Sequence, residues 1–177
     1  MIALRPAMPG DAEAIEALLA PAVSRGAILP RVVASADFIV ARQGTRLVGC
    51  VALTHQSSRV IELGSLVSTL SGVGLGRRLV EAATQRAATR GYDLIMALTA
   101  IPEFFQRTGF EAASHAPWIT AREQLRLPHP LPLAPAPEAV AASRAKATTC
   151  RVCPRLGACA QTLVLRAVPA ARHQRRA

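Results

Sequence analysis

Short runs of apolar residues, separated by turn-forming positions, dominate the first 120 residues of the chain. Runs of this length that are bounded by Gly, Pro, Asn, Asp or Ser are typical of β-strands. Gln43-Gly44-Thr45 lies between two of the runs, and its glycine can supply a hairpin turn. We therefore expect strands in five runs, the middle three forming an antiparallel meander: 2–4, 38–41, 47–53, 60–67 and 94–98.

Helical spacing of apolar residues occurs between these runs. Asp11 stands at an N-cap position before a helix that should continue through Leu19 and end before Pro21. A second helix follows the glycines at 72, 74 and 76, and Gly91 is placed to end it. Pro102 can open a short third helix, and an extended segment is expected at 112–119. This order predicts an α+β fold with a mixed, mostly antiparallel sheet flanked by helices.

The composition changes after residue 127. Five of the ten residues in 128–137 are proline, which predicts an extended, semi-rigid spacer. A length of 177 residues suits one domain with an appendage. We therefore expect a folded domain over 1–127, the spacer, and a basic, cysteine-containing C-terminal segment over 138–177.

The positive charge is concentrated in that last segment. The chain has a net charge of +10, yet residues 138–177 hold seven Arg and one Lys against Glu138 alone, and no aromatic residue. Proteins that bind single-stranded nucleic acid stack bases on aromatic rings. We therefore expect a solvated basic tail and no nucleic-acid partner.

The chain has neither the apolar length of a membrane span nor the hydrophobic region of a signal peptide near its start. A core of this size also has no need of a disulfide framework. We expect a cytoplasmic protein without a membrane partner; the sequence allows a homodimer and does not decide on one.

A glycine-rich turn, Gly72-Val73-Gly74-Leu75-Gly76-Arg77, follows an apolar strand and opens a helix. Its backbone N–H groups and the helix dipole could face a phosphate, although a plain tight turn also fits. The turn lacks the Gly-Lys-Ser/Thr of a nucleotide P-loop and the spacing of a dinucleotide fingerprint. A third ligand that such a turn could bind is coenzyme A.

Taken together, these motifs resemble those of the GNAT-type acetyltransferase superfamily. The resemblance rests on Ser65-Leu66-Val67 before the glycine turn, Arg77-Arg78-Leu79-Val80 after it, and the later segment 104–110, Phe-Phe-Gln-Arg-Thr-Gly-Phe. It implies the fold expected above and acetyl-CoA as co-substrate. The cofactor-binding positions that it implies are Leu66, Val67, Gly72, Gly74, Gly76 and Arg77, with a backbone N–H at Val67, beside Leu66, polarising the thioester carbonyl.

The chain departs from the superfamily pattern in two places. Ser71 stands where Gln or Arg is usual, in a segment that looks one residue short. Phe105 stands where many members have a tyrosine that protonates the leaving thiolate, and it has no proton to give.

A closer resemblance is to the short-form N-acetylglutamate synthases, which are amino-acid N-acetyltransferases. It is carried by the segments 28–31, 59–62, 98–99, 103–105 and the trailing cysteines. It implies an acceptor site at Leu29, Arg31 and Arg59. Arginine suits a substrate with two carboxylates, because its planar fork binds each of them bidentately.

Glu62 is the candidate general base. It lies in an otherwise apolar strand, where burial would raise its pKa toward a catalytically useful range. The alternative is an exposed carboxylate that pairs with Arg59.

Cys150, Cys153 and Cys159 supply three thiols, of which the first two have the spacing of half a zinc site. They could bind a metal or be buried or redox-active thiols. Cys50, alone in an apolar strand, is expected in the core.

The sequence thus predicts an acetyl-CoA-dependent N-acetyltransferase that acts on the α-amino group of L-glutamate, the first step of arginine biosynthesis. Two alternatives stay open. One is a GNAT enzyme for another amino acid or small amine, and the other is a non-catalytic module that binds coenzyme A or senses a metal.

Overall fold

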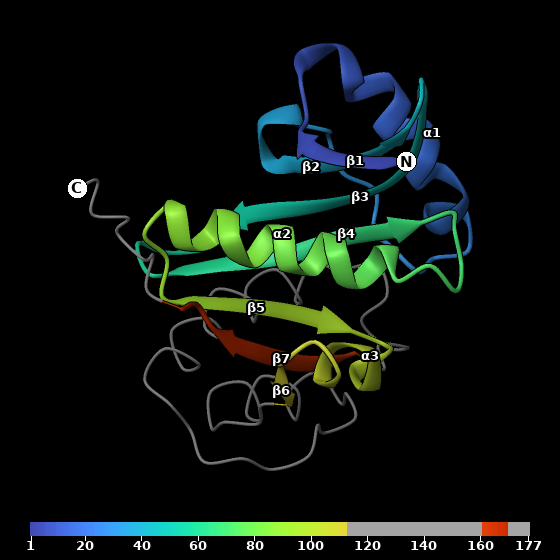
Figure 1. The fold of residues 1–177 in the computed structure, drawn as a ribbon. Coiled ribbons are helices and arrows are strands. Elements are labelled where there is room, and N and C mark those ends of the chain that lie inside the picture. Colours follow the sequence, from blue (N-terminus) through green and yellow to red (C-terminus); the bar gives the residue numbers. More distant parts are fainter. Residues whose placement is uncertain (113–160, 170–177) are drawn as a thin grey trace, which may run out of the picture. The chain divides into compact units, whose positions relative to one another are not determined.

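The structure is a computed structural model that describes residues 1–112 and 161–169 (Figure 1). Within these residues, seven strands pair in the order β1-β2-β3-β4-β5-β7-β6. The predicted α+β fold with a mixed, mostly antiparallel sheet is confirmed. The elements are β1 (Ile2–Pro6), α1 (Ala12–Ser24), β2 (Phe38–Gln43), β3 (Arg46–His55), β4 (Val60–Ser68), α2 (Leu75–Thr89), β5 (Leu94–Thr99), α3 (Pro102–Gln106), β6 (Glu111–Ala112) and β7 (Thr162–Ala167).

The chain divides into two compact units. The first consists of Met1–Thr54 with Leu63–Ala87, and the second of His55–Glu62 with the residues from Ala88 onward. Strand β4 contributes its first three residues to the second unit and the rest to the first.

The first unit packs α1 and α2 against β1, β2 and β3. β1 runs antiparallel to β2, and β2 antiparallel to β3, with a register shift at Ala41 and Arg42. Side chains alternate along β3, so that Cys50 and Ala52 join the cluster of α1 while Gly49 faces Leu75 and Leu79 of α2. The predicted core position of Cys50 is confirmed, since the residue is 0% exposed.

Helix α1 differs from expectation at both ends. It continues past Pro21 to Ser24. The proline removes one intrahelical hydrogen bond, and the burial of Ala22 beyond it compensates for this loss. Asp11 precedes the helix as predicted, but its side chain makes no capping hydrogen bond. The carboxylate binds Arg5 and Arg42 instead.

The second unit is built around β5. β5 runs antiparallel to β7, and β7 antiparallel to β6. The first residues of β4 run parallel to β5, with Val60 opposite Leu94 and Glu62 opposite Met96. Val60, Met96 and Leu163 form the core of this unit.

Strand β7 corrects the sequence interpretation. We expected a solvated tail throughout 138–177, and this is wrong for Thr162–Ala167, where Leu163 and Val164 are 0% exposed. The strand lies between β5 and β6, so its burial depends on pairing with residues far away in the sequence. The spacer at 128–137 and most of the expected segment 112–119 lie outside the described residues.

Candidate active site

The glycine turn leads directly into α2. Gly72 and Gly74 have φ values of +75° and +68°, and a Cβ added at either would meet nothing within 4 Å. Glycine is therefore favoured there by backbone conformation and not by crowding. The first amides of a helix have no partner within it, so the start of α2 can face an anion.

The two arginines that follow the turn differ in their surroundings. Arg77 is exposed on the first turn of α2. The Arg78 guanidinium donates a 3.0 Å hydrogen bond to the carbonyl oxygen of Ile2 in β1. Arg78 therefore ties α2 to β1, whereas Arg77 presents its charge to solvent.

Strand β4 bends at Ser65, which has φ +48°, a left-handed conformation that is rare for a residue with a side chain. The Cys50 sulfur lies 3.6 Å from the Ser65 carbonyl oxygen. Burial raises the pKa of the Cys50 thiol to about 12, and a hydrogen bond from the Val67 backbone acts in the opposite direction.

These contacts direct the backbone N–H groups of two consecutive residues, Leu66 and Val67, to different sides of β4. The carbonyl and N–H groups of a trans peptide point in opposite directions, and the described residues contain no cis peptide. Since the Ser65 carbonyl points to Cys50, the Leu66 N–H in the same peptide points away from β3. The Val67 N–H is directed at Cys50.

Glu62 is half-buried in β4 between buried Ile61 and Leu63. The Gln56 side-chain amide donates a 2.8 Å hydrogen bond to Glu62 Oε2. The Arg59 guanidinium is 2.5 Å from the Asp93 carboxylate, and the Arg59 side chain is 63% exposed. Gln56 was not among the site residues predicted from the sequence. The predicted turn between the two strands does contain residue 56, and residue 62 follows shortly after it, so the two can face each other.

Arg31 is held over the sheet of the first unit. Its guanidinium donates a 3.2 Å hydrogen bond to Thr54 Oγ1 and lies 3.5 Å from the Asp37 carboxylate. It also lies 5.4 Å from the centre of the Phe38 ring, a cation–π contact. The side chain is 26% exposed, so this cation is oriented and partly accessible.

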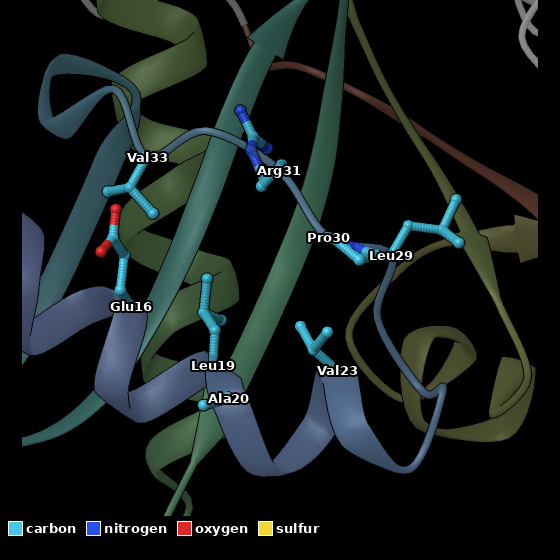
Figure 2. Close-up of a pocket in the computed structure, with 8 residues that line it drawn as sticks. All are labelled: Glu16, Leu19, Ala20, Val23, Leu29, Pro30, Arg31 and Val33. Atoms are coloured by element: carbon cyan, nitrogen blue, oxygen red, sulfur yellow. The ribbon is translucent and has the colours of Figure 1, made fainter.

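A pocket of about 200 Å³ lies between α1 and the segment that carries Arg31 (Figure 2). Figure 2 shows Leu19 pointing from α1 toward this segment, whereas the Arg31 guanidinium extends away from α1. Leu29, the other predicted acceptor residue on the segment, is 40% exposed. The pocket is lined by Glu16, Leu19, Ala20, Val23, Leu29, Pro30, Arg31 and Val33.

Phe105 is buried and makes edge-to-face contacts with Phe104 and Phe110, with ring centres 5.3 and 5.2 Å apart. It therefore serves the core of its unit. Cys150, Cys153 and Cys159 lie outside the described residues. Within the described residues, no cluster of His, Cys, Asp and Glu could hold a metal, and no helix is long and apolar enough to cross a membrane.

Comparison with solved structures shows the same fold. An N-acetylglutamate synthase from Neisseria gonorrhoeae, complexed with coenzyme A and N-acetyl-glutamate, matches 96% of this chain at 22% identity and a TM-score of 0.70. This chain spans about a third of that protein's length, 35%. A protein from Mycobacterium tuberculosis in complex with CoA matches 94% of this chain, and 99% of its own, at 22% identity and a TM-score of 0.70.

The amino-acid sequence matches a known family. Residues 34–112 match the acetyltransferase (GNAT) domain. An uncharacterized N-acetyltransferase from Chlorobaculum tepidum is 30% identical over 115 residues, which are 61% of this chain and 74% of the relative. Because the likeness extends over 74% of that relative, and the matched domain at 34–112 includes β4 and the glycine turn, the chain belongs to the GNAT acetyltransferase family.

Proposed function

We propose that the protein transfers the acetyl group of acetyl-CoA to the α-amino group of L-glutamate, feeding arginine biosynthesis. The single observation that carries the choice of acceptor is Arg31, a cation held in place by Thr54 and Phe38 and still partly accessible. Such a cation suits a carboxylate of the acceptor. The likeness to a protein that is an N-acetylglutamate synthase supports the same choice.

Acetyl-CoA would bind at the start of α2. The amides of the glycine turn face its pyrophosphate, and exposed Arg77 adds a positive charge there. The Leu66 N–H, directed away from β3, is the backbone donor that we assign to the thioester carbonyl. A donor at this place stabilises the negative charge that develops on the carbonyl oxygen.

Glu62 would act as the general base. The α-ammonium group of the acceptor gives a proton to the carboxylate, directly or through a water, and the neutral nitrogen attacks the thioester carbon. A C–N bond forms and the C–S bond breaks, so that coenzyme A leaves as a thiolate. The attacking nitrogen loses its second proton to solvent, and Glu62 releases its own proton before the next turnover. Phe105 cannot donate a proton, and a coenzyme A thiolate that leaves can take a proton from solvent.

One observation favours a second acceptor class. The Arg31 guanidinium already faces Asp37 and Thr54, which leaves it fewer donors for an incoming carboxylate. An amino acid with a neutral side chain would need one cationic partner fewer than glutamate. An amino-acid acetyltransferase with such an acceptor is therefore the second candidate.

The test is the release of free thiol from acetyl-CoA across a panel of amino acids and simple amines. We expect glutamate to give the highest kcat/KM. A higher value for glutamine or another neutral amino acid would replace glutamate by the second candidate. Binding of coenzyme A without turnover of any amine would instead support a non-catalytic coenzyme A module.

Two variants test the assigned residues. Arg31→Ala should raise the KM for glutamate about 10- to 100-fold, the range for a lost charged hydrogen bond, with little change in the KM for acetyl-CoA. Arg46→Ala, an exposed arginine on β3, is the matched control. Glu62→Gln should lower kcat by about 100-fold or more. An unchanged glutamate KM in Arg31→Ala would remove that residue from the acceptor site.

A further inference from the structure

The turn between β3 and β4 is tightly built. The backbone N–H groups of Gln56 and Ser57 both donate to the Val60 carbonyl, each at 3.1 Å. The Ser57 hydroxyl oxygen accepts from the N–H groups of Arg59 and Val60, at 3.4 and 3.2 Å. This short segment therefore has a defined conformation and not the freedom of an open loop.

Further contacts join this turn to the residues that lead into β5. The Arg59 carbonyl accepts hydrogen bonds from the N–H groups of Asp93 and Leu94, at 3.0 and 3.1 Å. The Arg59 guanidinium pairs with the Asp93 carboxylate, and His55 Nδ1 lies 2.9 Å from the Tyr92 hydroxyl. The turn is thus held at both of its ends within the second unit.

The turn places one side chain against Glu62. Gln56 Nε2 donates to Glu62 Oε2 at 2.8 Å, and the backbone of Gln56 is itself fixed through Val60. Glu62 follows buried Ile61 on β4, so its backbone is fixed as well. An amide that donates to one carboxylate oxygen limits the rotation of the carboxylate about its last torsion.

We infer that Gln56 is a positioning residue for Glu62, and that the 55–59 turn holds the Gln56 amide in place beside the carboxylate. The inference rests on the proposed role of Glu62 as general base. Gln56 takes no part in the proton transfer, because it only orients the oxygen atoms that accept the proton. Arg59 then acts as an anchor of the turn through Asp93, and not as a ligand of the acceptor.

Kinetics of Gln56→Met in the full-length protein test this inference. Methionine has a similar length and shape but no donor, so we expect kcat to fall about ten-fold while the KM values change less than two-fold. Gln85→Met, an exposed glutamine on α2, is the matched control and should leave kcat unchanged.

The decisive measurement is a double-mutant cycle with Glu62→Gln. If Gln56 acts through Glu62, adding Gln56→Met to Glu62→Gln lowers kcat no further. A full ten-fold loss in that background, or an unchanged kcat in Gln56→Met alone, would overturn the inference. If Glu62→Gln itself leaves kcat unchanged, it is the proposed base that fails, so the two failures are distinguishable.

Kinetics of an Arg59 variant provide an independent test, which can use any amino acid that the enzyme accepts as the acceptor. As an anchor, Arg59→Met should lower kcat and leave the acceptor KM within two-fold. A large rise in the acceptor KM would place Arg59 in the acceptor site and contradict its role as an anchor of the turn.

Discussion

The Cys50 sulfur of β3 lies 3.6 Å from the Ser65 carbonyl oxygen, at the point where β4 adopts a left-handed backbone conformation. Such a conformation costs roughly 1–2 kcal/mol for a residue with a Cβ. The thiol and the Ser65 carbonyl are both on the β3 side of the bend, and the Val67 N–H points to the same sulfur. Cys50 therefore packs against the β3 side of the bend in β4, and the Leu66 N–H points to the opposite side.

The thiol makes the stability of the protein sensitive to alkaline pH. Burial raises the pKa of Cys50 from an ordinary value near 9.0 to about 12 in the folded state. The unfolded chain releases the proton first, so this contribution is fully present below pH 9 and is lost as the pH rises from 9 to 12. At pH 10 the loss should be about 1 kcal/mol.

Urea unfolding at pH 8 and pH 10 measures this effect, with Cys50→Val as the reference. Valine keeps the bulk and has no proton to release, and all other groups are common to both proteins. We expect the wild type to lose more unfolding free energy than Cys50→Val between the two pH values. Equal losses would show that Cys50 does not respond to pH in this way.

Asp11 connects two strands near the N-terminus and should set the acid limit of stability. The Arg5 hydrogen bonds at 2.6 and 3.0 Å, and then the Met8 backbone N–H, lower the pKa of Asp11 to about 2. Arg42 adds a contact of 2.8 Å. The stability that Asp11 contributes is fully present at pH values above its ordinary pKa of 3.8, and it is lost as the pH falls through 2.

Asp11→Asn should cost about 2–4 kcal/mol at pH 7, because two partly buried guanidinium groups lose their carboxylate. Glu13→Gln, at an exposed position of α1, is the control and should stay within about 0.5 kcal/mol of wild type. Chemical denaturation at pH 7 and pH 3 provides the comparison. The gap between wild type and Asp11→Asn should narrow at pH 3, and a constant gap would contradict the ionic explanation.

Gly49 lies where β3 meets α2. A Cβ at this position would be 3.0 Å from the Val67 carbonyl oxygen and 3.1 and 3.2 Å from the side chains of Leu79 and Leu75. Gly49→Ala should therefore displace α2 and destabilise the protein by about 1–3 kcal/mol. Calorimetric titration with coenzyme A should show weaker binding, because α2 begins directly after the glycine turn.

Gly64 provides the matched control, because a Cβ there would meet nothing within 4 Å. We expect Gly64→Ala to bind coenzyme A as the wild type does. Unchanged stability and binding in Gly49→Ala would mean that α2 can shift without cost.

Strand β7 should contribute to stability through Leu163. This side chain is 0% exposed, whereas Leu165 on the same strand is half-buried. Leu163→Ala should cost about 2–5 kcal/mol, and Leu165→Ala clearly less. Thermal unfolding of both variants checks this order, and equal effects would argue against the strand's placement between β5 and β6.

Much of the secondary structure follows from local patterns. Gly44 has a positive φ value where the pattern predicted a hairpin turn, and Gly91 has one where it predicted the end of a helix. Both positions depend on the backbone freedom of a single residue, which the amino-acid type reveals directly. The glycine turn at Gly72 and Gly74 is predictable for the same reason.

Side-chain partners were harder to predict. Asp11 stood at a helix N-cap in the sequence, but its carboxylate binds Arg5 and Arg42, and the second of these is 31 residues away. The contacts of Arg31 with Thr54 and Asp37 also depend on the packing of the segment between α1 and β2 against the strands. No local spacing contains this information.

The sequence by itself determined the order of strands and helices up to β6, the glycine turn and the resemblance to the GNAT acetyltransferases, because each of these depends on residues close together in the chain. Only the tertiary structure decided that Thr162–Ala167 lies between β5 and β6, that Gln56 bonds to Glu62, and that Leu66 and Val67 direct their amides to opposite sides. These features depend on strand pairing and on the bend at Ser65, and both arise only when distant segments pack together.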